Sequence, residues 1–240
     1  MERAPLVLRA NAIAEWPRLA WVARIPTQGR VVELYHGPFV EVRDQWCVEG
    51  VWPASFAEGD FDKADLFFGS GLRIRDNQIV VVSSHSTFSR ILRLERSDEI
   101  ILSNSLPALL AISGANLIPD FLGYRERLNQ LKLGRKYFDW SIPILEGEIR
   151  YTLILNLLIE DGKVSLVEKP DLAPSFKSFS DYHTYLVEQM RALGRNFIDP
   201  ARKQIFLTSS SLSSGYDSAT AAALSREAGC KTAFTIDRAR

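Results

Sequence analysis

The sequence predicts an α+β domain followed by the start of an α/β domain, and three observations indicate this fold class. Short strand-like runs separated by turn residues fill the first two-thirds of the chain. A Pro- and Ser-rich stretch at Pro170–Ser180 then interrupts the apolar pattern, as expected of a linker. Beyond it, helical and strand-like segments alternate, which is typical of a parallel sheet. We therefore predict two domains, at residues 1–170 and 180–240.

The composition limits the class of protein. The 240 residues include 29 Lys and Arg against 29 Asp and Glu, and 46% are hydrophobic, values typical of a globular protein. Zero net charge removes the electrostatic argument for a nucleic-acid or anionic-membrane partner. The sequence has no secretory signal and no apolar run long enough to span a bilayer, so we expect a cytoplasmic protein.

The first domain is predicted as a meander of antiparallel strands. Its early strands are expected at Val31–Tyr35, Phe39–Val42, Leu72–Arg75, Gln78–Val82, Ile91–Leu94 and Ile100–Leu102. The pair Asp76-Asn77 fits a two-residue hairpin turn. Residues Ile149–Ile159 and Lys163–Val167 predict a longer hairpin around Asp161-Gly162.

Two helices are expected to interrupt this meander. The first covers Ser105–Ile112, with Ser103 or Asn104 as its cap and Gly114 at its end. The second covers Asp120–Lys132. Strands with a helical interruption are the pattern of an α+β domain.

The second domain begins with an amphipathic helix from a Ser180 cap to Phe197. Its apolar stripe, predicted to pack in a core, consists of Tyr182, Leu186, Met190, Leu193 and Phe197. The elements that follow are predicted as a strand at Ile205–Leu207, a loop at Thr208–Gly215, a helix at Asp217–Ala228 ending at Gly229 and a strand at Ala233–Ile236. This order is one βαβ unit, so a parallel sheet begins here.

The loop between that strand and that helix carries the strongest functional signal. Its residues are Leu212, Ser213, Ser214, Gly215, Tyr216, Asp217 and Ser218. Small residues before a helix N-terminus allow backbone amides to approach an anion. Asp217 would repel a bare phosphate, so its presence favours a metal ion between them. The pattern indicates a nucleotide-phosphate site with magnesium, and the alternative is a helix start capped by Asp and Ser with no ligand.

Residues Ser213–Ser218 resemble the SGGxDS pyrophosphate loop of the ATP pyrophosphatase superfamily, with Ser214 in place of the first glycine. By this resemblance Ser213, Ser214, Gly215 and Ser218 would hold the pyrophosphate of ATP. Asp217 would hold Mg²⁺. Leu212 and Ile236 would frame the base.

A leading β-rich domain before such a loop is similar to the asparagine synthetases, whose first domain is an N-terminal-nucleophile glutaminase. The segments Gly69–Arg75 and Ser103–Ala111 resemble that first domain. Such glutaminases use Cys at position 2, where this chain has Glu2. Cys47 is internal and has no free amine, so we predict no glutaminase activity. Both Cys47 and Cys230 are expected to be buried apolar residues.

The implied activity is ATP-dependent amide formation, with a nucleotide and a carboxylate-bearing small molecule or peptide as ligands. Only 28 residues run from Ser213 to Arg240 (240 − 213 + 1), which supply one βαβ unit. We therefore expect an incomplete synthetase half, completed by a longer chain, an oligomer or a partner. The alternatives are a non-catalytic interaction or scaffold protein and an ATP-binding module outside amide chemistry.

Other patterns give weaker signals. The segment Ser211–Gly215 approximates a hydrolase nucleophile elbow, but no histidine follows it. Six clustered aromatic residues are interpreted as core rather than as a pocket: Trp46, Trp52, Phe56, Phe61, Phe67 and Phe68. The sequence therefore assigns no catalytic residue.

Overall fold

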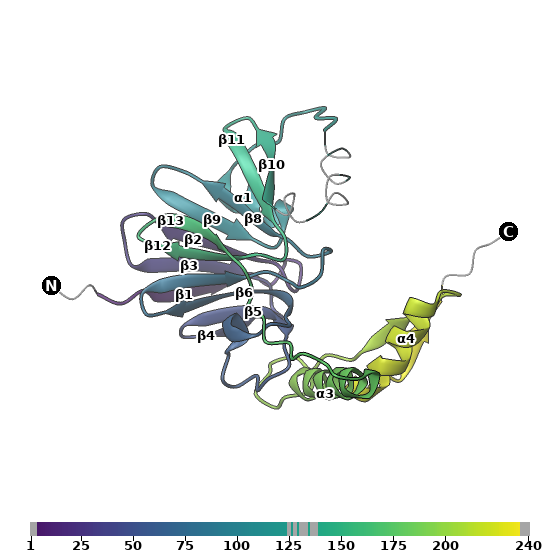
Figure 1. The fold of residues 1–240 in the computed structure, drawn as a ribbon. Helices are drawn as coiled ribbons and strands as arrows, with labels where there is room; N and C mark the ends of the chain where they lie inside the picture. Colours follow the sequence, from purple (N-terminus) through teal and green to yellow (C-terminus); the bar gives the residue numbers. More distant parts are fainter. Residues whose placement is uncertain (1–3, 124–125, 127–128, 130–133, 135–138, 236–240) are drawn as a thin grey trace. The chain divides into compact units, whose positions relative to one another are not determined.

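The structure is a computed structural model that describes residues 4–123, 126, 129, 134 and 139–235 (Figure 1). It divides into two compact units. The first, which we call the strand unit, comprises Met1–Gly50 and Phe67–Lys169. The second, the helical unit, comprises Val51–Leu66 and Pro170–Arg240. This division places Val51–Leu66, which the sequence analysis assigned to the first domain, with the residues of the second.

The strand unit contains a seven-stranded sheet in the order β1-β3-β2-β9-β8-β11-β10. Its strands are β1 (Val7–Ala12), β2 (Trp21–Pro26), β3 (Val31–His36), β8 (Ile91–Glu95), β9 (Glu99–Ser103), β10 (Asp139–Ile144) and β11 (Gly147–Thr152). Only the β1–β3 pair is parallel, and the other pairs of this sheet are antiparallel.

A second sheet of six strands has the order β13-β12-β7-β6-β5-β4. Its strands are β4 (Glu41–Arg43), β5 (Trp46–Val51), β6 (Phe68–Arg75), β7 (Gln78–Val82), β12 (Asn156–Glu160) and β13 (Lys163–Val167). The β6–β7 hairpin has the predicted tight turn, because Asp76 and Asn77 both have positive φ, at 50° and 63°. The expected mostly antiparallel character of this part of the chain is therefore confirmed.

The apolar core explains why one strand, β9, is buried along its whole length. One cluster draws on both sheets and includes Ala23, Leu34, Leu72 and Leu157. A second cluster joins the opposite face of the seven-stranded sheet to the helix α1 (Leu106–Ser113). Because both faces of this sheet are covered, β9 is buried at all five positions instead of alternating.

The helix predicted at Ser105–Ile112 is confirmed as α1, and Gly114 ends it in the left-handed conformation with φ of 67°. The expected cap is wrong, because Ser105 is the N-cap and makes no side-chain capping bond. Ser103 instead accepts a hydrogen bond from the Ser105 amide at 2.9 Å. Most of the helix predicted at Asp120–Lys132 lies outside the described residues.

The long strand predicted at Ile149–Ile159 is wrong. It is divided into β11 and β12, which belong to different sheets. The chain turns between them at Ile154, whose φ is 63°. Leu153 packs in the α1 cluster and Leu157 in the cluster between the sheets, so burial of both requires the chain to cross over. Only β12 and β13 form the expected hairpin around Asp161 and Gly162.

The helical unit is built around a long helix and a parallel strand pair. Its elements are η1 (Phe61–Lys63), α3 (Phe179–Phe197), β14 (Ser209–Ser211), α4 (Tyr216–Ser225), η4 (Arg226–Ala228) and β15 (Thr232–Phe234). The strands β14 and β15 pair in parallel, so the predicted strand–loop–helix–strand order is present as a two-stranded sheet. None of the described helices combines the length and apolar composition needed to cross a membrane.

Three predicted boundaries in this unit are wrong. Ser178 caps α3 by accepting a hydrogen bond from the Asp181 amide at 3.1 Å, so Ser180 lies inside the helix. The first strand is Ser209–Ser211 rather than Ile205–Leu207, because the serines pair with β15 and Leu207 is 92% exposed. The second strand ends at Phe234, and Ile236 lies outside the described residues.

A buried arginine forms the core of the helical unit. The Arg202 guanidinium lies over the rings of Trp52, Phe56 and Phe206, at 5.9, 4.2 and 5.1 Å from their centroids. It also donates hydrogen bonds to the backbone and side-chain oxygens of Asn196. The expected core role of the aromatic cluster is confirmed for the buried residues Trp46, Trp52, Phe56, Phe61 and Phe67, whereas Phe68 is 40% exposed.

Candidate functional site

The loop that the sequence predicts as a phosphate site lies between β14 and the N-terminus of α4. Gly215 is the N-cap residue and has an extended conformation, with φ of −83° and ψ of 148°. No side chain caps this helix. Its first amides therefore remain free of intrahelical partners at an exposed loop, which is the local geometry that favours an anion.

Two of the three serine hydroxyls in this loop, those of Ser213 and Ser218, hold the loop together. Ser213 Oγ and Ser218 Oγ are hydrogen-bonded at 2.7 Å, and Ser218 Oγ accepts from the Ser213 amide at 3.0 Å. The Gly215 amide donates to Ser213 Oγ at 3.3 Å. Ser213 and Ser218 thus keep the strand end and the first helical turn together, as a loop that supports a ligand requires.

Ser214, which replaces a glycine of the resembled motif, fits this backbone without strain. It is not among the non-glycine residues with positive φ in the described part of the chain. A serine Cβ is restricted only where φ is positive. The substitution at this position therefore leaves the loop conformation accessible.

Asp217 lies on the first turn of α4, where its side chain is exposed. The described residues contain no group of three His, Cys, Asp or Glu side chains that could hold a metal. Magnesium commonly takes one or two protein carboxylates and completes its shell with phosphate oxygens and water. A single carboxylate beside a phosphate loop fits that mode of binding, and does not fit a site made by protein ligands alone.

The predicted base-framing residues are less well defined. Leu212 donates its amide to Phe234 O at 2.8 Å, which fixes the start of the loop against β15. The side chains of Leu212 and Tyr216 are exposed, Tyr216 by 93%. The second framing residue, Ile236, lies outside the described residues. Among the described residues, Ser213, Gly215 and Ser218 lie together in this loop, and the base-framing role of Leu212 and Ile236 stays a prediction.

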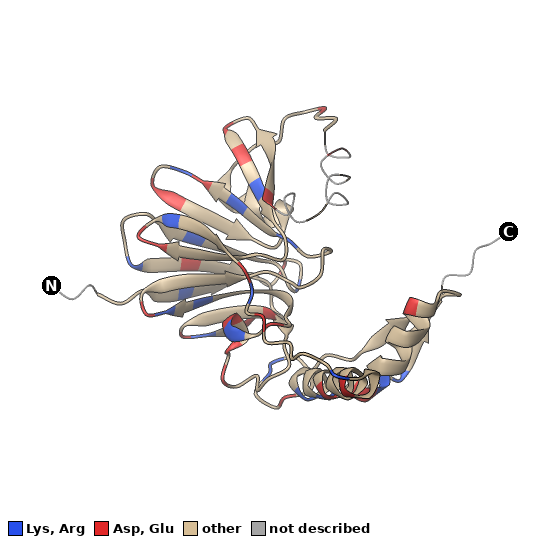
Figure 2. Ribbon diagram, in the orientation of Figure 1, with Lys and Arg blue, Asp and Glu red and all other residues tan. Residues whose placement is uncertain are grey.

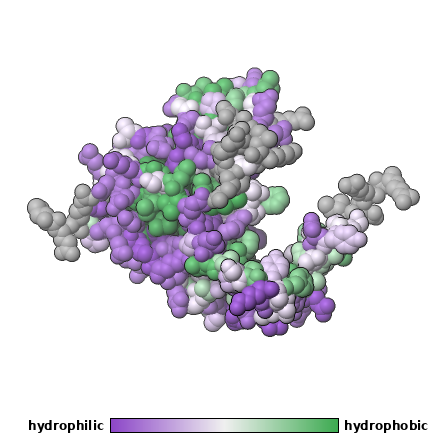
Figure 3. All heavy atoms as spheres, in the orientation of Figure 1, coloured by the Kyte–Doolittle hydropathy of each residue, from purple (hydrophilic) through white to green (hydrophobic). Residues whose placement is uncertain are grey.

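A groove lies beside the loop, between α3 and α4, with a volume of about 660 Å³. Apolar and aromatic side chains such as Phe179, Tyr182 and Leu186 line it, and Asp217 and Glu227 add carboxylates. Figure 3 shows green surface within the helical unit, consistent with an α3 stripe that is only partly covered. Of that stripe only Leu193 is buried, so its predicted packing in a core is incomplete.

The two cysteines differ. Cys47 is buried in the core between the two sheets, and burial raises the pKa of its thiol to about 12. This confirms the predicted buried role. Cys230 is only half-buried, so that prediction is wrong for it. A hydrogen bond from the Ser225 side chain is the main cause of the lowered pKa of the Cys230 thiol. Glu2 lies outside the described residues.

The segments Gly69–Arg75 and Ser103–Ala111 meet at the carboxylate of Glu49, which no sequence pattern predicted as a site. Ser70 Oγ donates to Glu49 Oε1 at 2.5 Å, and Asn104 Nδ2 donates to the same oxygen at 3.3 Å. Trp21 Nε1 donates to Ser70 Oγ at 2.8 Å. Burial raises the pKa of Glu49 to about 7. The available signal was a single acidic residue inside the apolar run Trp46–Val51.

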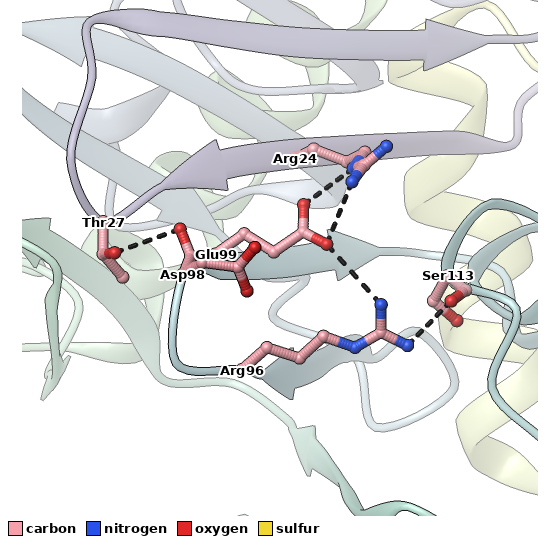
Figure 4. Close-up of polar contacts among 6 residues, drawn as sticks. All are labelled: Arg24, Thr27, Arg96, Asp98, Glu99 and Ser113. Atoms are coloured by element: carbon pink, nitrogen blue, oxygen red, sulfur yellow. Dashed lines mark hydrogen bonds and ion pairs between the residues drawn. The ribbon is translucent and has the colours of Figure 1, made fainter.

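A cluster of charged side chains in the strand unit connects neighbouring secondary-structure elements (Figure 4). Arg24 binds the Glu99 carboxylate with two hydrogen bonds, at 2.7 and 3.0 Å. Arg96 lies 3.6 Å from the same carboxylate and donates to Ser113 O at 2.7 Å. These bonds connect β2, β9 and the end of α1, and the opposite charges of the strand unit are interspersed in the same way in Figure 2.

Comparison with known proteins does not add a family to these observations. The chain matches no protein-family model, and no curated protein sequence matches it.

Proposed function

We propose that the loop between β14 and α4 binds the phosphates of ATP with Mg²⁺, in a protein of the asparagine-synthetase-like type that forms amides. The observation that carries this proposal is the strand–loop–helix–strand arrangement. It places Ser213, Gly215, Asp217 and Ser218 together at the N-terminus of α4, on a parallel strand pair. The same arrangement of elements and residues is the basis of the resemblance.

In this proposal each loop residue has a defined task. The amide of Ser214 and the amides of the first turn of α4 would hold the pyrophosphate oxygens, while the Gly215 amide donates within the loop to Ser213 Oγ. Asp217 would hold Mg²⁺, and this ion would supply positive charge to offset that of the leaving pyrophosphate. A carboxylate oxygen of the substrate bonds to the α-phosphorus of ATP as the bond to pyrophosphate breaks. An amine then forms the amide, and AMP leaves with the former carboxylate oxygen.

The proposal includes no glutamine hydrolysis. A glutaminase of the resembled type needs a thiol on the residue that carries the free α-amine. Position 2 is Glu, and Cys47 is an internal core residue whose thiol has a pKa of about 12. The nitrogen would come from ammonia or another amine. We also propose that the strand unit is a glutaminase-like domain without the nucleophile.

The first test is the melting temperature with ATP and Mg²⁺, compared with either alone. We expect an increase only when both are present, because a ligand that binds the folded state stabilises it. Asp217→Ala should abolish the increase. Asp171→Ala, which removes an exposed carboxylate in the linker, is the matched control and should retain it. An ATP effect that persists in Asp217→Ala would show that this loop is not the magnesium site.

Exchange of pyrophosphate into ATP with a panel of carboxylates separates the remaining alternatives. An amide-forming enzyme gives both the melting-temperature increase and the exchange. An ATP-binding module outside amide chemistry gives the increase alone. A scaffold protein, in which Asp217 and Ser218 only begin a helix, gives neither result.

A further inference from the structure

Lys169, the last residue of the strand unit, has an amine held by uncharged acceptors. It follows β13, and its side chain is half-buried. Nζ donates to Ser83 O and to Asn156 Oδ1, both at 2.6 Å. Asn156 Oδ1 also accepts from the Ser83 amide at 3.3 Å, so the amide oxygen is fixed between two donors.

No carboxylate offsets the charge that this amine would carry. Among the described residues Lys169 forms no ion pair, and both acceptors that hold Nζ are neutral. Two acceptors match the two N–H groups of a neutral amine, whereas an ammonium has a third. Burial without a counter-ion favours the neutral form. Burial is the one cause that lowers the pKa of Lys169, to about 7.

The neighbouring Ser83 supplies a second, independent observation. Its side chain is fully buried, and its Oγ has no hydrogen-bond partner among the residues that the structure describes. A buried hydroxyl without a partner is uncommon in folded proteins. This hydroxyl belongs to the residue whose carbonyl oxygen holds Nζ, so one residue at this end of the sheet supplies both the acceptor for the amine and a buried hydroxyl.

From this cluster we propose that Lys169 is a site of covalent modification by small aldehydes or ketones. The Nζ lone pair forms a bond to the carbonyl carbon, and the carbonyl oxygen takes up a proton to give a carbinolamine. The oxygen then leaves as water with the remaining proton from nitrogen, and an imine is formed. No oxidant or reductant is required. The half-buried position of Lys169 limits the reagent to a small carbonyl compound.

The test is reductive alkylation of the full chain with formaldehyde and cyanoborohydride at pH 7, followed by peptide mass spectrometry. An amine with a pKa near 7 has about a thousandfold more neutral form at this pH than an ordinary lysine. Even with restricted access, we expect Lys169 to be labelled at least tenfold faster than the exposed Lys163 and Lys177. Equal or slower labelling of Lys169 would overturn the proposal.

Asn156→Asp is the most specific variant, because it places a carboxylate where the amide oxygen now accepts from Nζ. It should raise the pKa of the amine, reduce Lys169 labelling at pH 7 to the rate of Lys163, and leave Lys163 unchanged. If this variant does not fold, the pH profile of wild-type labelling decides. A midpoint near 7 supports the proposal, and a midpoint near 10 contradicts it. Lys169→Arg should remove the labelled peptide in either case.

Discussion

At the scale of single residues, the informative groups are polar side chains inside apolar surroundings. Glu49 and Lys169 both lie in the strand unit, and burial shifts their pKa values in opposite directions, to about 7 in each case. Glu49 keeps its position through Ser70 and Asn104, and Lys169 through a backbone carbonyl and Asn156. Both groups have hydrogen-bond partners without a counter-ion, so both favour their neutral forms.

Replacement of Glu49 by Gln should change how stability depends on pH. The pKa of Glu49 is raised in the folded state, from 4.5 to about 7. The wild-type contribution is therefore fully present below pH 4.5 and is lost as the pH rises through 7. Glu49→Gln removes this loss. We therefore expect the difference in unfolding free energy between Glu49→Gln and wild type to be about 1–3 kcal/mol more favourable to the variant at pH 8 than at pH 4. Urea unfolding at several pH values measures the effect.

The exposed Glu15 of the strand unit provides the control for this experiment. Glu15→Gln should leave the pH dependence of wild type unchanged. A Glu49→Gln protein whose stability falls between pH 4.5 and 7 as steeply as that of wild type would show that the carboxylate is not protonated in the fold.

At the scale of elements, local signals predicted where helices occur better than where they begin. The helix α3 and the glycine that ends α1 were predicted correctly, because helical periodicity and left-handed glycine are local properties, whereas the core packing of the α3 stripe is incomplete. The α3 cap was misplaced by two residues, because Ser178 and Ser180 are both good caps. The strand β14 was missed, because three serines have little apolar content and pair only through their backbone.

Two single substitutions test the corrected α3 cap. Ser178→Ala removes the bond that the Ser178 hydroxyl accepts from the Asp181 amide, so we expect a loss of about 1 kcal/mol in unfolding free energy. Ser180→Ala changes a residue inside the helix and should cost less than about 0.5 kcal/mol. Chemical denaturation of the two variants compares them directly. A larger loss of unfolding free energy for Ser180→Ala than for Ser178→Ala would show that Ser180 is the capping residue.

At the scale of the whole molecule, the two units do not simply follow one another along the chain, because each is made of two separate segments. Val51–Leu66 leaves the strand unit after β5, packs in the helical unit, and is followed by β6. Arg202 holds this segment through Trp52 and Phe56, and Asn196 Nδ2 donates to Ala54 O at 2.8 Å. The helical unit therefore uses residues from two separate parts of the sequence.

Arg202→Met should loosen that arrangement. It keeps much of the side-chain volume but removes both hydrogen bonds to Asn196 and the charge over the rings. We expect a loss of about 2–4 kcal/mol in stability of the helical unit and faster amide hydrogen exchange in Val51–Leu66. Arg195→Met, at an exposed position of α3, is the control. Unchanged exchange in Val51–Leu66 for Arg202→Met would contradict this role.

Three features could be predicted without the structure: the antiparallel character of the first part, the βαβ order around the Ser213–Ser218 loop and the core position of Cys47. Turn residues, periodicity and small-residue loops are local signals, and they were sufficient for these features. The sheet change at Ile154, the place of Val51–Leu66 and the buried surroundings that shift the pKa values of Glu49 and Lys169 are visible in the folded structure alone. Each of these depends on residues far apart in the chain, because burial and pairing are properties of the packed fold.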